Sequence, residues 1–263
     1  MPESINYIIS FLYIITSVLI WKYLSYNFNN RNFKLLIMSI WTSALLIHIY
    51  SIYPIFVDLF IINLSLLYAL IVVSLFISII LFFLSFKGNF EYMGMVVLPI
   101  ISLIFLLIPE TSLMNVKINN LLFSHIVISL ISYSIICLCA TQAFFLKLQE
   151  NRLQKNNPSS IVSSLPPLET MDILLFKFLV FGVISLSISL LSGFLFLENI
   201  FSKLMIEKSS LSLLAWIIFV YLLFGRLQYG WRGEKAANIT LVGFTILFLA
   251  YFGTRAFLEV FII

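Results

Sequence analysis

Long apolar runs separated by short polar hinges make up most of this chain. A helix needs about 20 apolar residues to cross the hydrocarbon core of a bilayer, and runs of that kind recur along the whole sequence. The pattern predicts about eight membrane-spanning helices, over residues 5–24, 35–54, 63–86, 92–109, 121–146, 173–197, 211–228 and 236–258. The fourth run is short for a span but ends cleanly at Pro109. The predicted fold class is an all-α, polytopic membrane protein.

Two of the connections between these runs contain proline. Residues 54–62 are apolar but include Pro54 and Asp58, which predicts an interfacial loop. Residues 149–172 form a long polar connection, and the prolines within it exclude a continuous helix. We expect a single integral membrane domain over residues 1–263, which this loop divides into a five-span part and a three-span part. The loop is either a docking surface or, as we favour, a flexible tether.

The composition agrees with a membrane location. The mean hydropathy is +1.12 and 10% of the residues are charged, whereas soluble domains carry about 25% charged residues. The formal net charge of +4 does not indicate nucleic-acid binding, because the basic residues lie between apolar runs, where they set membrane topology. We therefore expect the lipid bilayer, and no nucleic acid, as a partner.

The distribution of basic residues predicts how the spans are oriented. If the loop after the first span faces the cytoplasm, 11 of the 15 basic residues lie on the cytoplasmic side and 4 on the outer side. Because Lys and Arg are enriched in cytoplasmic loops, both termini are predicted to lie on the outer side. The 149–172 loop and the polar turn at 229–238 are then cytoplasmic. The outer-side residues are Lys117, Lys203, Lys208 and Arg255.

Both histidines of the chain fall inside predicted spans. Ionisable side chains are costly within a membrane, which makes them functional candidates by default. His48 lies about six residues from the outer boundary of the second span, and His125 about five residues from that of the fifth. With a rise of 1.5 Å per residue, both lie roughly 6–9 Å below the outer interface. Two imidazoles at one depth could bind one haem iron or hydrogen-bond to buried polar partners, and the residues leave both alternatives open.

Hydroxyl residues, most of them serines, follow the helix face of His125 and a face of the next span. They are Ser129, Ser132 and Tyr133 in the fifth span, and Ser185, Ser189 and Ser192, with Gly193, in the sixth. Positions three, four and seven residues apart share one side of a helix. Small hydroxyl residues at this spacing predict helix-packing seams.

The sequence carries no signature of common enzymes. It lacks an H-E-x-x-H metal motif, a G-x-S-x-G nucleophile motif and a glycine-rich phosphate loop. Acidic residues within spans, which a proton relay or transporter would require, are not expected here. We therefore predict a protein that is not an enzyme.

Several stretches of the second half resemble a known family. The segments "SHIVISLISYSIICLCATQAFFL" and "GWRGEKAANITLVGFTILFLAYFG", with the eight-span layout, are similar to the cytochrome c assembly superfamily that includes CcsA, CcmC and HemX. The segments "LPPLETMD" and "LSLLAWIIFVYLLFGRLQYGWRG" resemble the YpjD-like inner-membrane subgroup most closely. The resemblance covers about residues 35–258 and is strong from about residue 121 onward.

The resemblance implies a haem-handling protein of the bacterial inner membrane. His125 matches the histidine that opens the fifth span in this family, where it is a haem ligand at the outer face. His48 is similar to a second-span histidine of YpjD-like and HemX-like members. The outer loop between the sixth and seventh spans lacks the W-x-W-D core of haem-presenting members, and two further family histidines are absent. These departures argue against a complete haem-presenting synthetase.

The leading hypothesis is a membrane-embedded haem-handling or cytochrome c assembly accessory protein. It would hold haem near the outer face through His125, with His48 as a second candidate ligand of the iron, and perform no bond-making. Basic outer-side residues would pair with the two haem propionates, and Arg255 is the best candidate because it follows the YFG turn. The alternative is a cofactor-free interaction or stabilising subunit of another inner-membrane protein, docked through the 149–172 loop.

Overall fold

The helices of this chain form two compact units. The computed structural model describes residues 3–26, 31–57, 61–63, 66–88, 90–107, 115–117, 119–155, 162, 164–196 and 203–253. Unit 1 comprises Met1–Lys117 with Asn151–Pro166, and unit 2 comprises Ile118–Glu150 with Pro167–Ile263. The fifth predicted span therefore packs with the spans that follow the long polar connection.

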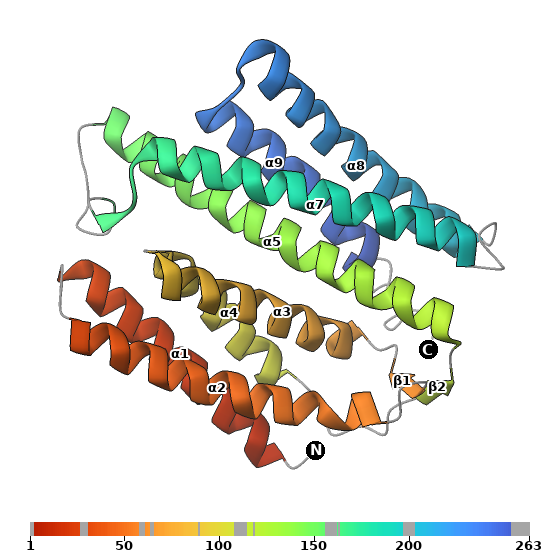
Figure 1. Ribbon diagram of the computed structural model, residues 1–263, viewed down its shortest axis with the longest axis horizontal. Coiled ribbons are helices and arrows are strands. Elements are labelled where there is room, and N and C mark those ends of the chain that lie inside the picture. Colours follow the sequence, from red (N-terminus) through yellow and green to blue (C-terminus); the bar gives the residue numbers. More distant parts are fainter. Residues whose placement is uncertain are drawn as a thin grey trace. The chain divides into compact units, whose positions relative to one another are not determined.

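Among its described residues, unit 1 contains a bundle of the helices α1 to α4 and two short strands (Figure 1). Its elements are α1 (Glu3–Ser25), α2 (Arg31–Val57), β1 (Ile61–Asn63), α3 (Leu66–Lys87), the 3₁₀ turn η1 (Glu91–Met93), α4 (Gly94–Leu106) and β2 (Asn115–Lys117). α1 lies beside α2 and α4, and α3 lies beside the same two helices. This ring of contacts encloses a core that includes the buried side chains of Tyr13, Trp41 and Phe105.

Two hydrogen bonds fix the register of α4 against α1. The hydroxyl oxygens of Ser10 and Ser102 lie 2.6 Å apart, and the Ser17 hydroxyl donates to the Met95 carbonyl at 3.1 Å. From the first bond to the second, the position on α1 rises by seven residues and the position on α4 falls by seven. The two helices are therefore antiparallel, with a constant register. On this register the last residue of α4 is level with Asn6. α4 therefore lies beside residues 6–18 of α1 and is shorter than the fourth predicted span.

α2 and α3 are also antiparallel. The Lys34 ammonium donates to the Gly88 carbonyl at 3.2 Å, and seven residues further along α2 the Trp41 indole N–H donates to the Ser78 hydroxyl at 2.9 Å. The end of unit 1 that contains Lys34 and the last turns of α1 and α3 is called the Lys34 end below. The opposite end, where Asn6 lies, is called the Asn6 end. The topology predicted from the basic residues puts the Lys34 end in the cytoplasm.

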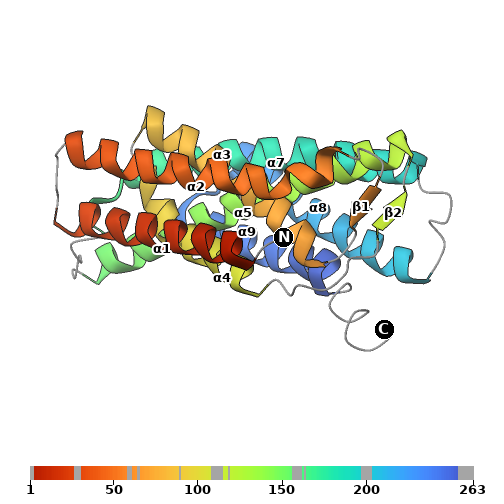
Figure 2. The same ribbon diagram turned by 90° about the horizontal axis from the view of Figure 1, so that it is seen from below.

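A short antiparallel ladder joins two connections of unit 1. β1 pairs with β2 so that Ile62 lies opposite Val116, and Figure 2 shows the two strands side by side. The sequence pattern does not predict these strands. At three residues each, they leave the predicted all-α fold class unchanged.

Unit 2 also contains four long helices. They are α5 (Asn120–Gln154), α7 (Leu168–Phe196), α8 (Lys203–Tyr229) and α9 (Gly233–Phe248), followed by the π-helical turn η2 (Leu249–Gly253). α8 lies beside α7, α9 and η2. α5 and α7 are antiparallel, because Ser129 bonds to Ser189 toward one end of the pair and Gln142 bonds to Met171 toward the other.

Most of these helices are suited to a bilayer. Within the described part of the chain, seven helices are long and apolar enough to cross a membrane, and the shorter apolar helix Glu91–Leu106 corresponds to the fourth predicted span. The prediction of an all-α polytopic membrane protein is confirmed. The side on which the termini lie stays a prediction.

Some element boundaries differ from those predicted. α2 continues through Pro54, where the sequence predicts an interfacial loop. Membrane helices tolerate proline because neighbouring groups satisfy the freed backbone carbonyl. α5 continues to Gln154 and α7 begins at Leu168, so the polar connection is shorter than residues 149–172. Asp58 lies outside the described residues.

Candidate functional site

His125 lies in the second turn of α5, where two serines of α7 hold its ring. The Nδ1 atom of His125 is 2.9 Å from Ser192 Oγ, and the Ser192 hydroxyl donates to the Ser189 carbonyl at 2.9 Å. One turn further along α5, the hydroxyl oxygens of Ser129 and Ser189 are 2.7 Å apart. The predicted packing seam between the fifth and sixth spans is therefore confirmed, and His125 is part of it.

The Ser192 hydroxyl determines which nitrogen of His125 carries the proton. A serine hydroxyl has a single proton to donate, and Ser192 Oγ lies at hydrogen-bond distance from both the Ser189 carbonyl and His125 Nδ1. When the hydroxyl donates to the Ser189 carbonyl, Ser192 Oγ accepts from His125 and Nδ1 carries the ring proton. In this tautomer Nε2 has a free lone pair. A hydrogen bond at one ring nitrogen that leaves the other as the donor atom is the arrangement of metal-binding histidines.

Glycine at position 193 lets the His125 ring pack closely against α7. A Cβ atom on Gly193 would lie 3.0 Å from His125 Cε1 and 3.6 Å from His125 Nε2. Any larger residue would therefore crowd this edge of the imidazole. The His125 ring is only partly buried, so a ligand can approach the side of the ring that carries Nε2.

A lysine and two tyrosines lie in the same part of unit 2. The Lys208 ammonium lies 4.1 Å from the centroid of the Tyr251 ring, and the rings of Tyr251 and Tyr133 are 5.1 Å apart. Lys208 is close enough for its charge to act on His125. The π-helical turn η2 positions Tyr251, and turns of this kind occur often at functional sites. Arg255, predicted as the cation of this site, lies outside the described residues.

His48 lies in the core of unit 1 and is completely buried, with 0% of its surface exposed. Its Nδ1 atom is 2.8 Å from the Tyr13 hydroxyl, and its ring meets Phe105 edge-on with 4.7 Å between centroids. The Ile71 backbone lies near the ring, but Nε2 has no hydrogen-bond partner among the described residues. His48 and His125 belong to different units, and each is placed within its own unit.

The two histidines differ in how well they suit a haem. In the described ranges no group of three or more His, Cys, Asp or Glu side chains could hold a metal ion. A single imidazole is enough to bind the iron of a haem, because haem takes only one or two axial ligands from the protein. His125 fits this role through its free Nε2, its partial exposure and the nearby Lys208. His48 offers a free nitrogen, but its enclosed ring leaves no room for a macrocycle.

A buried ion pair at the Lys34 end of unit 1 was missed by the sequence reasoning. Glu91 is 3% exposed, and its Oε1 atom lies 2.9 Å from Lys34 Nζ. Glu91 begins the shorter apolar helix Glu91–Leu106, one residue before the fourth predicted span, and the sequence reasoning gave it no role. The signal in the sequence for this buried turn is Gly94. A Cβ atom on Gly94 would lie 3.0 Å from Ile20 Cδ1, so a glycine lets the turn pack closely against α1.

Unit 1 encloses several polar atoms that lack a protein partner. Among the described residues of this unit, they are Asn6 Oδ1, Ser25 Oγ, His48 Nε2, Ser85 Oγ and Glu91 Oε2. Leaving a buried polar group unsatisfied costs about 1–3 kcal/mol, so these atoms together would cost about 5–15 kcal/mol. That range equals the net stability of a typical domain, about 5–15 kcal/mol. Internal water commonly satisfies such groups.

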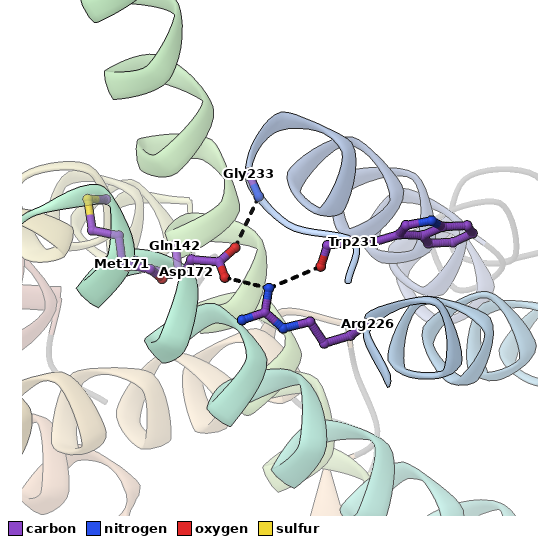
Figure 3. Close-up of polar contacts among 6 residues, drawn as sticks. All are labelled: Gln142, Met171, Asp172, Arg226, Trp231 and Gly233. Carbon is purple, nitrogen blue, oxygen red and sulfur yellow. Dashed lines mark hydrogen bonds and ion pairs between the residues drawn. The ribbon is translucent and has the colours of Figure 1, made fainter. Parts of the chain in front are cut away.

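The polar turn at 229–238 is anchored by an ion pair with α7. Arg226 Nη1 is 3.0 Å from Asp172 Oδ2, and the same nitrogen donates to the Trp231 carbonyl at 3.2 Å (Figure 3). The other oxygen of Asp172 accepts the backbone N–H of Gly233 at 3.0 Å. A carboxylate at the start of α9 is favourable because it meets the positive end of the helix dipole. The topological role predicted for Arg226 does not anticipate this pairing.

The fold defines a polytopic helical membrane protein whose second unit carries a partly buried histidine in the seam between α5 and α7. The chain belongs to the cytochrome C assembly protein family, which it matches over residues 4–262. The family predicted from the sequence segments is therefore confirmed. No solved structure matches the chain.

Individual relatives place the chain within this family. It is 30% identical to inner membrane protein YpjD of Escherichia coli (strain K12) over 200 residues, which cover 73% of this chain and 74% of YpjD. It is 24% identical to cytochrome c biogenesis protein CcsA of Guillardia theta over 199 residues, 66% of each chain. CcsA of Chlamydomonas reinhardtii is 28% identical over 140 residues, which cover 52% of this chain and 38% of that protein.

Proposed function

We propose that this chain holds haem near the outer face of the membrane through His125, as an accessory protein of cytochrome c assembly. Family membership supports a haem-handling role in cytochrome c biogenesis. The observation that carries the proposal is the geometry of His125, whose Nδ1 is bonded to Ser192 and whose partly buried ring packs with its Cε1 edge against Gly193. The chain itself performs no bond-making in this proposal.

The residues around His125 would divide the binding of haem between them. Haem supplies the iron and its coordination chemistry when bound, and His125 Nε2 would be the axial ligand. Ser192 would keep the ring in the required tautomer and orientation. Lys208, held over the ring of Tyr251, would pair with a propionate through a charge-assisted hydrogen bond. Arg255 stays the predicted partner of the other propionate.

A version of the proposal with two axial ligands adds His48. Its unpartnered Nε2 suits a ligand, but Tyr13 and Phe105 enclose the ring. We therefore propose His125 as the primary ligand. The number of ligands is read from the reduced spectrum, because six-coordinate haem gives sharp α and β bands and five-coordinate haem gives broad ones.

The test is an absorbance spectrum of the detergent-purified protein, expressed with haem supply and recorded oxidised and then reduced. The expected result is a Soret band that disappears in His125→Ala. Ser124→Ala is the matched control, because Ser124 is only partly buried and its hydroxyl bonds within its own helix, to the Leu121 carbonyl. This control should keep the full band. His48→Ala should keep it as well if His125 is the primary ligand.

Two results would overturn the proposal. Full haem occupancy in a double variant, His125→Ala with His48→Ala, would remove the ligand assignment. A featureless spectrum from well-folded wild-type protein would support the alternative of a cofactor-free interaction or stabilising subunit. In that case the family relationship would describe the fold alone, and a stoichiometric membrane partner should co-purify with the chain.

We also propose a location in the bacterial inner membrane, with both termini outside. The relative from Escherichia coli is named as an inner membrane protein, and the distribution of basic residues supports the orientation. A partner from an assembly complex would meet the cytoplasmic connection within residues 149–172. Cysteine labelling of that connection from either side of the membrane tests the orientation.

A further inference from the structure

We infer that unit 1 forms a proton path across the membrane, in which His48 and Glu91 are the groups that exchange protons. The inference concerns unit 1 alone and does not depend on haem binding at His125. It rests on a continuous set of buried polar residues, called the polar file below. These residues are Asn6, Ser10, Tyr13, Ser17, His48 and Glu91.

The polar file follows one face of α1 through the bundle. Asn6, Ser10, Tyr13 and Ser17 are spaced by four, three and four residues, which places them on one side of the helix. None of the four is more than 8% exposed. From Asn6 to Ser17 the helix rises about 17 Å, somewhat more than half of the hydrocarbon thickness of about 30 Å. On the register of α4, Glu91 is level with residue 21 of α1, so the polar file as a whole covers about 22 Å of that depth.

Partners from the other helices meet this face at three successive depths. From the Asn6 end, the pairs are Ser10 with Ser102, Tyr13 with His48, and Ser17 with the Met95 carbonyl. The pair of Lys34 with Glu91 follows toward the Lys34 end, between α2 and η1. Along α1, each of the first three levels is three or four residues from the next, about 4.5–6 Å. One water molecule with two hydrogen bonds of about 2.8 Å spans such a gap.

The unpartnered atoms argue against a seam that serves packing alone. In a packing seam each polar atom finds a partner across the helices, because an unsatisfied buried group is costly. Here Asn6 Oδ1 is unpartnered at one end, His48 Nε2 in the interior, and Ser85 Oγ with Glu91 Oε2 near the Lys34 end, among the described residues. These are the positions at which water must complete a chain of hydrogen bonds.

The groups of the polar file can pass a proton in steps that conserve charge. A hydroxyl both donates and accepts hydrogen bonds, so it can receive one proton and release another. His48 can take a proton at Nε2 and release the proton of Nδ1 to the Tyr13 hydroxyl oxygen, which passes its own proton onward. Rotation of the imidazole then restores the starting tautomer. Glu91 Oε2 can accept and release a proton at the Lys34 end, where Lys34 stabilises the carboxylate.

The surroundings of His48 contain one titratable side chain at hydrogen-bond distance. That side chain is Tyr13 of α1. α4 contributes the ring of Phe105 and α3 contributes the backbone of Ile71. Lys34 lies 14 residues before His48 on the same helix, about 21 Å along the axis. The proton on His48 is therefore controlled by Tyr13 and by water at Nε2.

The test is proton flux through the full chain reconstituted into vesicles of phosphatidylcholine and phosphatidylglycerol, loaded with the pH-sensitive dye pyranine. A potassium gradient with valinomycin sets the membrane potential. The wild-type protein should change the internal pH faster than protein-free vesicles. His48→Phe and Glu91→Gln should each lower the protein-dependent rate by about 100-fold, the lower end of what a positioned proton-transfer group contributes. The matched control, Thr42→Val, changes a hydroxyl on the exposed face of α2 and should keep the rate.

The wild-type measurement decides the inference even if a variant fails to fold. Flux equal to that of protein-free vesicles would overturn it, as would full flux in both His48→Phe and Glu91→Gln. His125→Ala separates this inference from the proposed function, because that variant should lose the Soret band and keep the proton flux. Loss of flux in His125→Ala with folded protein would also contradict a path confined to unit 1.

Discussion

The indole of Trp231 occupies the space that a side chain on residue 225 would need. A Cβ atom on Gly225 would meet the indole carbons, and the Trp231 backbone N–H donates to the Gly225 carbonyl at 3.2 Å. The Lys235 ammonium lies 3.6 Å from the centre of the indole. The turn between α8 and α9 is therefore closed by a backbone bond, a direct contact with glycine and a cation on the aromatic ring.

This contact predicts different costs for two glycine substitutions in the same turn. Gly225→Ala must displace Trp231, and we expect a loss of about 3 kcal/mol, the upper end of ordinary overpacking. Gly230 has a φ of 65° and nothing within 4 Å of its Cβ position. Gly230→Ala should therefore cost only the left-handed backbone conformation, about 1–2 kcal/mol. Denaturant unfolding in detergent compares them, and a larger loss in Gly230→Ala would contradict this account.

The ion pair between Asp172 and Arg226 predicts a salt-dependent effect on stability. Asp172→Asn keeps the acceptor for the Gly233 N–H but removes the charge opposite Arg226, whose side chain is 32% exposed. Solvent screens such a pair, so we expect a loss of about 1 kcal/mol at low salt. Asp172→Ala also removes the acceptor at the start of α9 and should lose about 1 kcal/mol more.

Unfolding of the three proteins at low and high salt tests this prediction. The difference between wild type and Asp172→Asn should shrink as salt screens the pair, while the further loss in Asp172→Ala should persist. A salt-independent loss in Asp172→Asn would show that hydrogen-bond geometry matters more than the charge.

Hydropathy predicts the spans of this chain because each helix must bury its backbone polar groups within an apolar run. It does not predict which helices pack together, since no local signal indicates that the 121–146 span joins those after the long polar connection. Pro54 illustrates a second limit. Proline usually ends a soluble helix, but α2 continues through it.

The site shows the same division between local and tertiary information. The position of His125 near one end of α5 and the serine seam follow from spacing along single helices. The tautomer of His125 depends on Ser192, which is 67 residues away, so sequence spacing cannot supply it. The burial of Glu91 depends on Lys34 of another helix, and hydropathy alone reads a charged residue beside glycines as part of a loop.

Substitutions of Gly193 and Gly182, which both lie on α7, should affect haem binding and helix packing separately. A Cβ on Gly193 would press on His125, whereas a Cβ on Gly182 would lie 2.9 Å from Ile136 Cγ1. If His125 holds haem as proposed, Gly193→Ala should weaken haem affinity about tenfold, or about 1.4 kcal/mol. Gly182→Ala should keep haem affinity and lose about 1–3 kcal/mol of stability. Soret titration and thermal unfolding of both variants measure the two effects, and equal haem affinity would contradict a ligand role for His125.

The Lys34–Glu91 pair predicts that removing Lys34 alone destabilises the protein more than removing both residues. Lys34→Met leaves the Glu91 carboxylate, 3% exposed, without its cation. Breaking a buried pair in this way costs about 3–5 kcal/mol, and the partial exposure of Lys34 favours the lower value. A double variant, Lys34→Met with Glu91→Leu, removes the charge that burial penalises, so it should be more stable than Lys34→Met alone.

Denaturant unfolding of the two single variants and the double variant forms a cycle that isolates the pair. A double variant as unstable as the sum of the single ones would show that the two residues act independently. The Lys34 end would then hold Glu91 through water rather than through its ion pair. The same double variant lacks the proposed proton acceptor, so a stable double variant that no longer conducts protons would separate the role of Glu91 in the proton path from its role in packing.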